Sequence, residues 1–240
     1  MLKKRKTQQK LNKIVSDIPY DPISEAYQIL SANIQLMLEG SSQKTILVTS
    51  VQAGEGKSVT ASNIACAYAL MGKRVLLIDA DIRKPSLHNK LEIENKMGLS
   101  DYLKGDTNIM GITKPFKAVN GLYVITAGRI EQDPVSLLSH DRMKYLINQG
   151  SRIFDYIILD APPAVGFADT MILSSMVNST LIVAKEKLLD KRKISFVLKK
   201  LERISNNVIG FLLVDVKEAE AKDKYYFDYR NKQSLLLLGK

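Results

Sequence analysis

Six short apolar runs rich in β-branched residues recur along the chain, and helix-compatible sequence separates each run from the next. They lie at 45–49, 74–78, 122–126, 156–159, 180–184 and 208–214. Because their apolarity is continuous and does not alternate, we expect strands that are buried on both faces. Helices are expected at 24–39, 57–71, 135–149, 168–176 and 190–205. This rhythm predicts an α/β fold with a doubly wound, mostly parallel sheet flanked by helices, which binds ligands at the carboxyl ends of its strands.

The chain length of 240 residues, 45% of them hydrophobic, fits one large domain with tails. We expect a basic flexible arm at 1–20, the domain at 21–217 and a polar, tyrosine-rich tail at 218–240. No stretch approaches the roughly 20 apolar residues of a membrane span, and no signal peptide is visible, so we expect a cytoplasmic protein. The single cysteine, Cys66, excludes an intramolecular disulfide and is expected to pack within a helix.

The net charge of +10 is distributed unevenly. The first 13 residues carry six Lys or Arg side chains and no acidic one, which fits an anionic membrane surface, a nucleic acid or simply a solvated tail. A second basic cluster falls on the last predicted helix and is expected to be a solvated helix face. Its members are Lys191, Arg192, Lys193, Lys199, Lys200 and Arg203.

A glycine-rich loop, T-S-V-Q-A-G-E-G-K-S at 49–58, joins the first predicted strand to an Ala-rich predicted helix. Glycines at 54 and 56 let the backbone approach an anion, and the helix adds the positive end of its dipole. Lys57 would reach the terminal phosphates of a nucleotide, and Ser58 would ligate magnesium. Val51 stands where the common form of the loop has its first glycine. The expected nucleotide-binding residues here are Ala53, Gly54, Glu55, Gly56, Lys57, Ser58 and Val59.

Carboxylates follow two other predicted strands. Asp79 and Asp81 end the run V-L-L-I-D-A-D, and their spacing of two lets them project the same way on an extended chain. Asp160 ends the run Y-I-I-L-D and precedes two prolines. With Lys57 and Ser58, these side chains can hold a metal and accept a proton from an attacking hydroxyl, which suffices for phosphoryl transfer.

The tail contains a tyrosine cluster, K-Y-Y-F-D-Y-R at 224–230. Tyr225, Tyr226 and Tyr229 are candidate phosphate acceptors, and each phosphate would add about −1.5 to −2 charges. A short amphipathic segment docked on the sheet edge is the plainer interpretation. Four leucines at 235–238 fit either a contact between molecules or a frayed end.

Together these motifs resemble the bacterial tyrosine kinases, in particular the cytoplasmic kinase subunits that accompany capsular and exopolysaccharide synthesis. The likeness covers roughly residues 22–230 and includes D-x-D-x-R at 79–83, D-P-V-S-L-L at 133–138 and D-A-P-P at 160–163. The resemblance implies that ATP and Mg²⁺ are the cofactors and that Lys57 contacts the phosphates. It makes Asp79 the leading general base and assigns magnesium to Ser58, Asp81 and Asp160. Arg83 matches a family position that we assign to the cofactor site.

The same resemblance implies autophosphorylation of Tyr225, Tyr226 and Tyr229, commonly between neighbouring molecules. It also implies a transmembrane adaptor of the polysaccharide co-polymerase type, a cognate tyrosine phosphatase, peripheral association with the membrane through the adaptor, and a homo-oligomer; it implies no nucleic acid partner. Two departures weaken details of this picture. Gln28 and Ser31 replace both arginines of the family's E-x-x-R-x-x-R ring-forming pattern, and Asp215 replaces an amide that would contact the base.

Two other functions compete with this one. A partitioning or positioning ATPase of the ParA or MinD type shares the loop, but that class carries a signature lysine where this chain has Gln52. A nucleotide-gated scaffold would bind ATP without transferring phosphate, and the intact Asp79, Asp81 and Asp160 argue against it.

Overall fold

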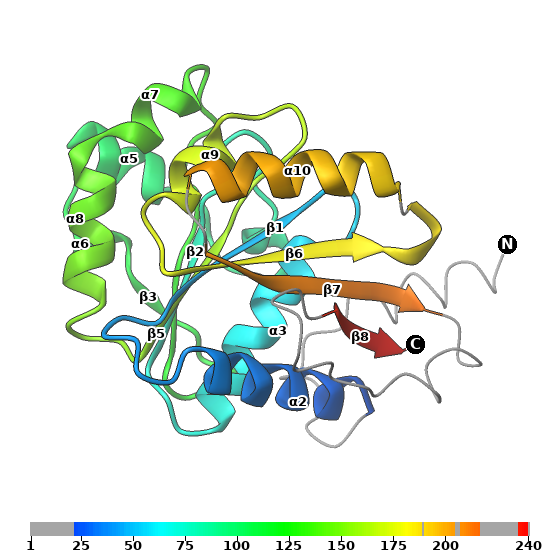
Figure 1. Cartoon of the computed structure of the whole chain (residues 1–240). Coiled ribbons are helices and arrows are strands. Elements are labelled where there is room, and N and C mark those ends of the chain that lie inside the picture. The colour runs from blue at the N-terminus through cyan, green and yellow to red at the C-terminus, as the bar shows by residue number, and fades with distance from the viewer. Residues whose placement is uncertain (1–21, 189, 205–206, 217–234, 240) are drawn as a thin grey trace, which may run out of the picture.

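Eight strands form one sheet in the order β3-β4-β2-β5-β1-β6-β7-β8 within the residues that the computed structural model describes, namely 22–188, 190–204, 207–216 and 235–239 (Figure 1). Every pair of neighbours is parallel except β3 and β4. This confirms the predicted doubly wound, mostly parallel sheet. The strands are β1 Thr45–Ser50, β2 Val75–Asp79, β3 Lys114–Pro115, β4 Leu122–Ile125, β5 Tyr156–Asp160, β6 Ser179–Lys185, β7 Val208–Val216 and β8 Leu235–Gly239.

Helices cover both faces of the sheet (Figure 1). One face packs against α2 (Pro22–Met37), α3 (Lys57–Leu70) and α4 (Leu87–Lys90). The other face packs against α5 Leu99–Lys104, α6 Ile109–Ile112, α7 Pro134–Ser139, α8 Asp141–Gly150, α9 Asp169–Ser174 and α10 Lys191–Ile204. A short 3₁₀ helix, η2 (Glu186–Leu188), links β6 to the segment before α10.

The central strands are apolar throughout because each side of the sheet faces a layer of helices. In β1, Ile46 and Val48 pack in the core beneath α2 and α3, whereas Leu47 packs in the core on the opposite face. All three side chains are fully buried, and burying one such side chain contributes about 1.5–3 kcal/mol. Cys66 is also buried, within α3, as predicted.

The predicted helix at 135–149 is two helices in the structure. His140 has extended backbone angles (φ −65°, ψ 145°), and its side chain accepts a hydrogen bond from the Arg142 N–H, so α8 starts anew after α7. Asp133 caps α7 in the same way, through the Ser136 N–H. The sequence analysis also did not predict β3 or the short helices α4, α5 and α6.

The C-terminal leucines differ from expectation. The sequence analysis expects a tail at Leu235–Gly239, whereas in the structure these residues form β8 and pair with β7, with Phe211 opposite Leu235 and Leu212 opposite Leu236. The physical reason is that a run of apolar residues can pair with an otherwise open strand edge. The predicted N-terminal arm at 1–20 and the tyrosines at 225, 226 and 229 lie outside the described residues. Among the described helices, none combines the length and apolarity that crossing a bilayer requires.

Candidate active site

The glycine-rich loop joins β1 to α3 and has the backbone shape of an anion cradle. Gly54 and Gly56 adopt left-handed conformations, with φ of 84° and 94°, which glycine reaches without steric cost. A side chain at Gly54 would meet no atom within 4 Å, so the space above that part of the loop is open. The helix that begins at Lys57 directs its free N–H groups toward its N-terminus.

Two side chains hold the loop from inside. The buried Glu55 carboxylate accepts a hydrogen bond of 2.6 Å from the Gln52 N–H, and the Ser50 hydroxyl donates to the Gln52 carbonyl at 2.6 Å. Burial raises the pKa of Glu55, while hydrogen bonds from the backbone N–H groups of Gln52, Lys185 and Val51 act in the opposite direction. Glu55, predicted to bind the nucleotide, therefore shapes the loop with its side chain and leaves its backbone for a ligand.

The three predicted carboxylates meet the loop lysine at the carboxyl edge of the sheet. β2 and β5 are neighbours with Asp79 opposite Asp160. The Lys57 ammonium lies 2.8 Å from an oxygen of Asp81 and 3.4 Å from an oxygen of Asp160, and it donates to the Ser58 hydroxyl at 3.3 Å. Burial alone would lower the pKa of Lys57, but Asp160 and Asp81 outweigh it and raise that pKa.

Asp79 has two unlike oxygens. Its Oδ2 accepts hydrogen bonds from the N–H groups of Ser86 and Leu87 at the start of α4, at 3.2 and 3.0 Å. Its Oδ1 is buried and has no hydrogen-bond partner within the described part of the chain. Burial raises the pKa of Asp79 to about 8, and the nearby Asp160 carboxylate adds to that rise. Burial likewise raises the pKa of Asp160, against the opposing effect of Lys57.

Ser86 belongs to this site although no sequence pattern marked it. Its hydroxyl donates to the hydroxyl of Ser58, the predicted magnesium ligand, at 2.9 Å. The contact arises because Asp79 holds the Ser86 backbone in place next to the start of α3. Ser86 therefore positions Ser58, and only the three-dimensional fold brings the two together.

Arg83 forms its ion pair with Asp169 and not with the carboxylates that contact Lys57. Its guanidinium forms a fork with the buried Asp169, with Nε 2.6 Å from Oδ2 and Nη2 3.1 Å from Oδ1, and it lies over the Phe167 ring at 5.2 Å. Asp169 opens α9. The fork thus ties the segment after β2 to the segment after β5. We predicted Arg83 at the cofactor, and the structure places its charged end on Asp169.

Gln52 occupies the position of the signature lysine and is held within its own chain. Its side-chain oxygen accepts a 2.7 Å hydrogen bond from the Lys193 ammonium of α10, and its amide donates to the Leu188 carbonyl at 3.4 Å. Asp215, at the end of β7, has a left-handed backbone (φ 61°) and lies 3.3 Å from the Lys185 ammonium. It therefore offers a buried carboxylate where we noted that the family has an amide.

The oxygen donors of the site fit a magnesium ion that is bound together with nucleotide phosphates. No three His, Cys, Asp or Glu side chains in the described ranges form a ready metal cage. Mg²⁺, however, is usually held by one or two carboxylates plus substrate phosphates. Asp160 Oδ2 is buried without a hydrogen-bond partner among the described atoms, and the Ser58 hydroxyl lies next to Lys57. Oxygen donors of this kind match the preference of Mg²⁺.

Comparison with known proteins decides the family. The chain matches the ParA family, described as "NUBPL iron-transfer P-loop NTPase", over residues 41–215. It is 30% identical over 225 residues to the tyrosine-protein kinase YwqD of Bacillus subtilis, an alignment that covers 94% of both chains. The chain belongs to the bacterial tyrosine kinase family. The resemblance inferred from the motifs is therefore confirmed.

Some of the related tyrosine kinases are longer than this chain. The tyrosine-protein kinase etk of Escherichia coli is 29% identical over 197 residues, which are 82% of this chain but 27% of etk. The chain thus spans about a quarter of that relative. The solved kinase domain of the E. coli enzyme superposes with a TM-score of 0.80 at 29% identity and covers 83% of this chain and 78% of that domain. The P-loop fold of the bacterial tyrosine kinases is shared across this alignment.

Proposed function

We propose that the protein is an ATP-dependent protein-tyrosine kinase that phosphorylates the tyrosines at 225, 226 and 229 of its own tail and regulates capsular or exopolysaccharide synthesis. One observation carries the proposal. The Lys57 ammonium of the phosphate loop lies against Asp81 and Asp160, beside Asp79, at the edge of the sheet where this fold binds ligands. Membership of the bacterial tyrosine kinases supports it.

The loop would bind the phosphates of ATP. Backbone N–H groups at 53–59 and the start of α3 supply donors, and Lys57 would exchange its carboxylate partners for phosphate oxygens. Ser58, Asp81 and Asp160 would hold magnesium, with Ser86 orienting the Ser58 hydroxyl. When bound, the ion would neutralise charge on the transferring phosphoryl group.

Asp79 would act as the general base. Its Oδ2 is fixed by two backbone N–H groups, which leaves Oδ1 to accept the proton of a tyrosine hydroxyl. The phenolic oxygen forms a bond to the γ-phosphorus, and the bond from that phosphorus to the bridging oxygen breaks to release ADP. A base whose pKa lies near the working pH is suited to this transfer.

The proposed setting follows from the family resemblance. A transmembrane adaptor would activate the kinase and keep it at the cytoplasmic side of the membrane, and a phosphatase would reset the tail. Gln28 and Ser31, in place of two arginines, leave the ring form of the oligomer without its usual charged contacts. In the structure Gln28 is exposed on α2, whereas Ser31 is buried. A buried position suits the small, uncharged serine better than the arginine of the family pattern.

The ParA-family match also fits a partitioning or positioning ATPase. That class reaches across a dimer with a lysine at the position of Gln52. Here the Gln52 side chain forms hydrogen bonds with the Lys193 ammonium and the Leu188 carbonyl of its own chain. We therefore favour the kinase.

Mass spectrometry of the tail tests the proposal. Wild type and Lys57→Met would be incubated with ATP and Mg²⁺, with and without the cytoplasmic segment of the adaptor. We expect phosphate on the tail tyrosines of the wild type and at least about a hundredfold less in Lys57→Met, because one preorganised charged group commonly contributes 10²–10³ in rate. Thermal unfolding would check that Lys57→Met is folded, and Ser58→Ala is a second variant. Unmodified tyrosines in wild type under both conditions would refute the kinase, and ATP hydrolysis stimulated by DNA would favour the partitioning ATPase.

A further inference from the structure

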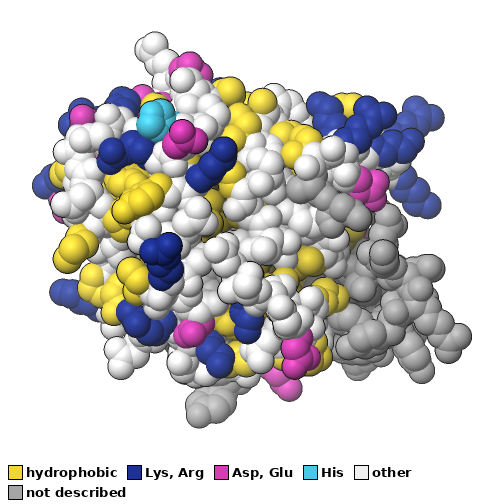
Figure 2. All heavy atoms as spheres, turned by 60° about the vertical axis from the view of Figure 1, so that its left-hand side comes forward, with side chains coloured by type: hydrophobic (Ala, Val, Ile, Leu, Met, Phe, Trp, Pro, Cys, Tyr) yellow, Lys and Arg dark blue, Asp and Glu magenta, His cyan; other side chains and the backbone are white. Residues whose placement is uncertain are grey.

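Three members of the basic cluster on α10 line a shallow groove. Figure 2 shows Lys and Arg side chains gathered at the upper right of the molecule, at the height that α10 has in Figure 1. The groove is lined by Lys191, Arg192, Ser195, Phe196 and Lys199. No carboxylate within the described residues forms an ion pair with Lys191, Arg192 or Lys199. The groove therefore combines three unpaired cations, a hydroxyl and an aromatic ring.

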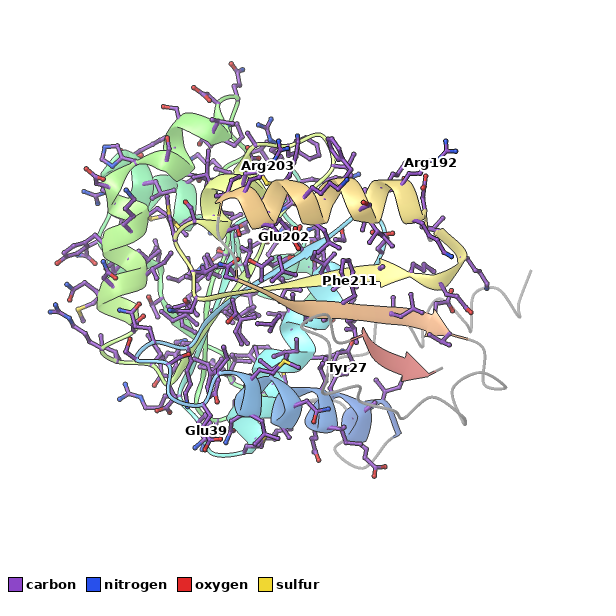
Figure 3. All side chains as sticks on the ribbon, viewed as in Figure 1. Tyr27, Glu39, Arg192, Glu202, Arg203 and Phe211 are labelled. Carbon is purple, nitrogen blue, oxygen red and sulfur yellow. The ribbon has the colours of Figure 1, made fainter. Side chains whose placement is uncertain are left out.

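The carboxylates nearest in sequence do not neutralise the groove. Asp190 is used as the cap of α10, where its Oδ1 accepts from the N–H groups of Arg192 and Lys193. Glu202 lies toward the other end of the helix, as Figure 3 shows, beside Arg203. Because the Asp190 carboxylate already occupies these free N–H groups, an anion in the groove would be held by the side chains of Lys191, Arg192 and Lys199.

Phe196 distinguishes this groove from a plain anion site. Its ring is 50% exposed, and the Lys200 ammonium lies 4.6 Å from the ring centre. A ligand that carries both a phosphate and an aromatic ring can pair with the cations and stack on Phe196 at once. A phosphotyrosine has this composition, whereas a phosphoserine and a lipid headgroup have no aromatic ring, and the bases of duplex DNA are stacked on one another.

The segment that carries the tyrosines begins at the end of the molecule where the groove lies. β7 ends at Val216, and η2, which precedes α10, packs against β7. Figure 3 places Arg192 at the same end of the molecule as the carboxyl end of β7. Tyr225 is nine residues beyond Val216, so the connecting chain can span up to about 30 Å.

We infer that the groove on α10 is the docking site of a phosphorylated tyrosine from the chain's own 217–234 segment. The inference rests on the proposed function for the origin of the phosphate. Arg192 takes the phosphate together with Lys191 and Lys199, and the ring stacks on Phe196. Lys193, the residue after Arg192, is bonded to Gln52 of the phosphate loop, so a docked tail lies on the helix that contacts the loop. A tail held there is withheld from a neighbour's active site.

Fluorescence anisotropy with a labelled peptide of residues 222–232 tests the inference. The peptide would carry phosphotyrosine at 225, 226 and 229 or none, and the protein would be the full chain treated with phosphatase, without ATP. We expect the phosphorylated peptide to bind at least about tenfold more tightly than the unmodified one. The same peptide with three phosphoserines should bind at least about threefold more weakly than the phosphotyrosine form, because it cannot stack.

Two variants with the same change of charge distinguish specific binding in the groove from general attraction by the positive charge of α10. Arg192 and Arg203 are both exposed on α10, about 16 Å apart along the helix axis, and only Arg192 lines the groove (Figure 3). Arg192→Glu should weaken binding of the phosphotyrosine peptide at least about tenfold, and Arg203→Glu at most about twofold. Phe196→Ala should abolish the preference for phosphotyrosine over phosphoserine. Circular dichroism would confirm that each variant is folded.

Several outcomes would overturn the docking site. These are equal binding of modified and unmodified peptide, equal losses in Arg192→Glu and Arg203→Glu, and binding of anionic phospholipid vesicles or duplex DNA that competes fully with the peptide. The experiment does not depend on kinase activity. A tail that is phosphorylated with ATP but does not dock contradicts this inference alone, and a peptide that docks on a protein without kinase activity contradicts the proposed function alone.

Discussion

Asp79 is a buried carboxyl whose two oxygens have different surroundings. Because burial and the Asp160 carboxylate raise its pKa to about 8, the folded chain keeps this proton at pH values where the unfolded chain has lost it. The protonated Asp79 carboxyl therefore stabilises the folded state relative to the unfolded state. This contribution to the free energy of unfolding is fully present below the unfolded pKa of about 4 and is lost as pH rises toward and through about 8.

Asp79→Asn cannot ionise, and its amide oxygen can still accept from Ser86 and Leu87. We therefore expect the free energy of unfolding of Asp79→Asn, relative to wild type, to increase between pH 5 and pH 8, with a slope of at most about 1.4 kcal/mol per pH unit. Urea unfolding at three pH values measures it. Asp106→Asn, at an exposed position, is the control. Identical pH dependence in wild type and Asp79→Asn would contradict the shift.

Residue patterns predicted the central cluster of charged side chains because parallel strands deliver their last residues to one edge of a sheet. Asp79, Asp81, Asp160 and Lys57 were expected together, and the structure brings them together. Ser86 and Lys193 could not be predicted in this way. Ser86 reaches Ser58 only through the turn capped by Asp79, and Lys193 reaches Gln52 across 141 residues of sequence. No local pattern encodes either contact.

At the scale of elements, the Arg83–Asp169 fork connects the segments that follow β2 and β5. Its carboxylate is buried, so removing the fork leaves a charge without a planar partner. Arg83→Lys should lower the free energy of unfolding by about 1–2 kcal/mol, because lysine cannot form two parallel hydrogen bonds. A double-mutant cycle with Asp169→Asn in urea measures the coupling. Arg152→Lys, at an exposed position, should have little effect. Additive effects of Arg83→Lys and Asp169→Asn would show that the fork does not stabilise the fold.

The same fork should affect catalysis only indirectly, by holding the segments after β2 and β5 in place. Among the residues that the structure describes, no hydrogen bond joins Arg83 to Lys57 or to Ser58. We expect Arg83→Lys to lower kcat for tail phosphorylation and to leave the KM for ATP nearly unchanged. Steady-state kinetics at several ATP concentrations separates the two quantities. A large rise in KM alone would instead place Arg83 at the nucleotide.

Long elements were predictable and short ones were not. Each helix or strand with a sustained apolar pattern appears within a few residues of its predicted position, as α3 does at Lys57–Leu70. α4 and α6 have four residues each, so a period of 3.6 has no room to appear. The break at His140 depends on a side-chain cap, which hydrophobic periodicity does not report.

At the scale of the whole molecule, β8 closes one side of the sheet. It pairs with β7, which otherwise has no second neighbour among the described strands. A chain that ends at residue 234 should therefore lose stability, by about 1 kcal/mol or more, which corresponds to a fall in Tm of about 2–4 °C per kcal/mol. It should also aggregate more readily, because the edge of β7 is left unpaired.

Differential scanning calorimetry and light scattering would measure both effects. A matched control is a chain shortened by Lys240 alone, which lies beyond β8. Unchanged Tm and unchanged scattering after removal of 235–240 would show that β8 contributes nothing to the sheet.

The strand β8 also constrains the proposed phosphorylation of the tail. In the sequence, the tyrosines at 225, 226 and 229 fall between Val216 of β7 and Leu235 of β8, two residues that lie in the same sheet. Tyr229 precedes Leu235 by six residues, so it stays within about 20 Å of that strand whatever course the chain takes. If the proposed phosphorylation takes place between molecules, the active site of one must come within about 20 Å of β8 of the other, and unpairing of β8 would lengthen that distance. The strength of one edge-strand pairing would thus set how far apart kinase and substrate can be.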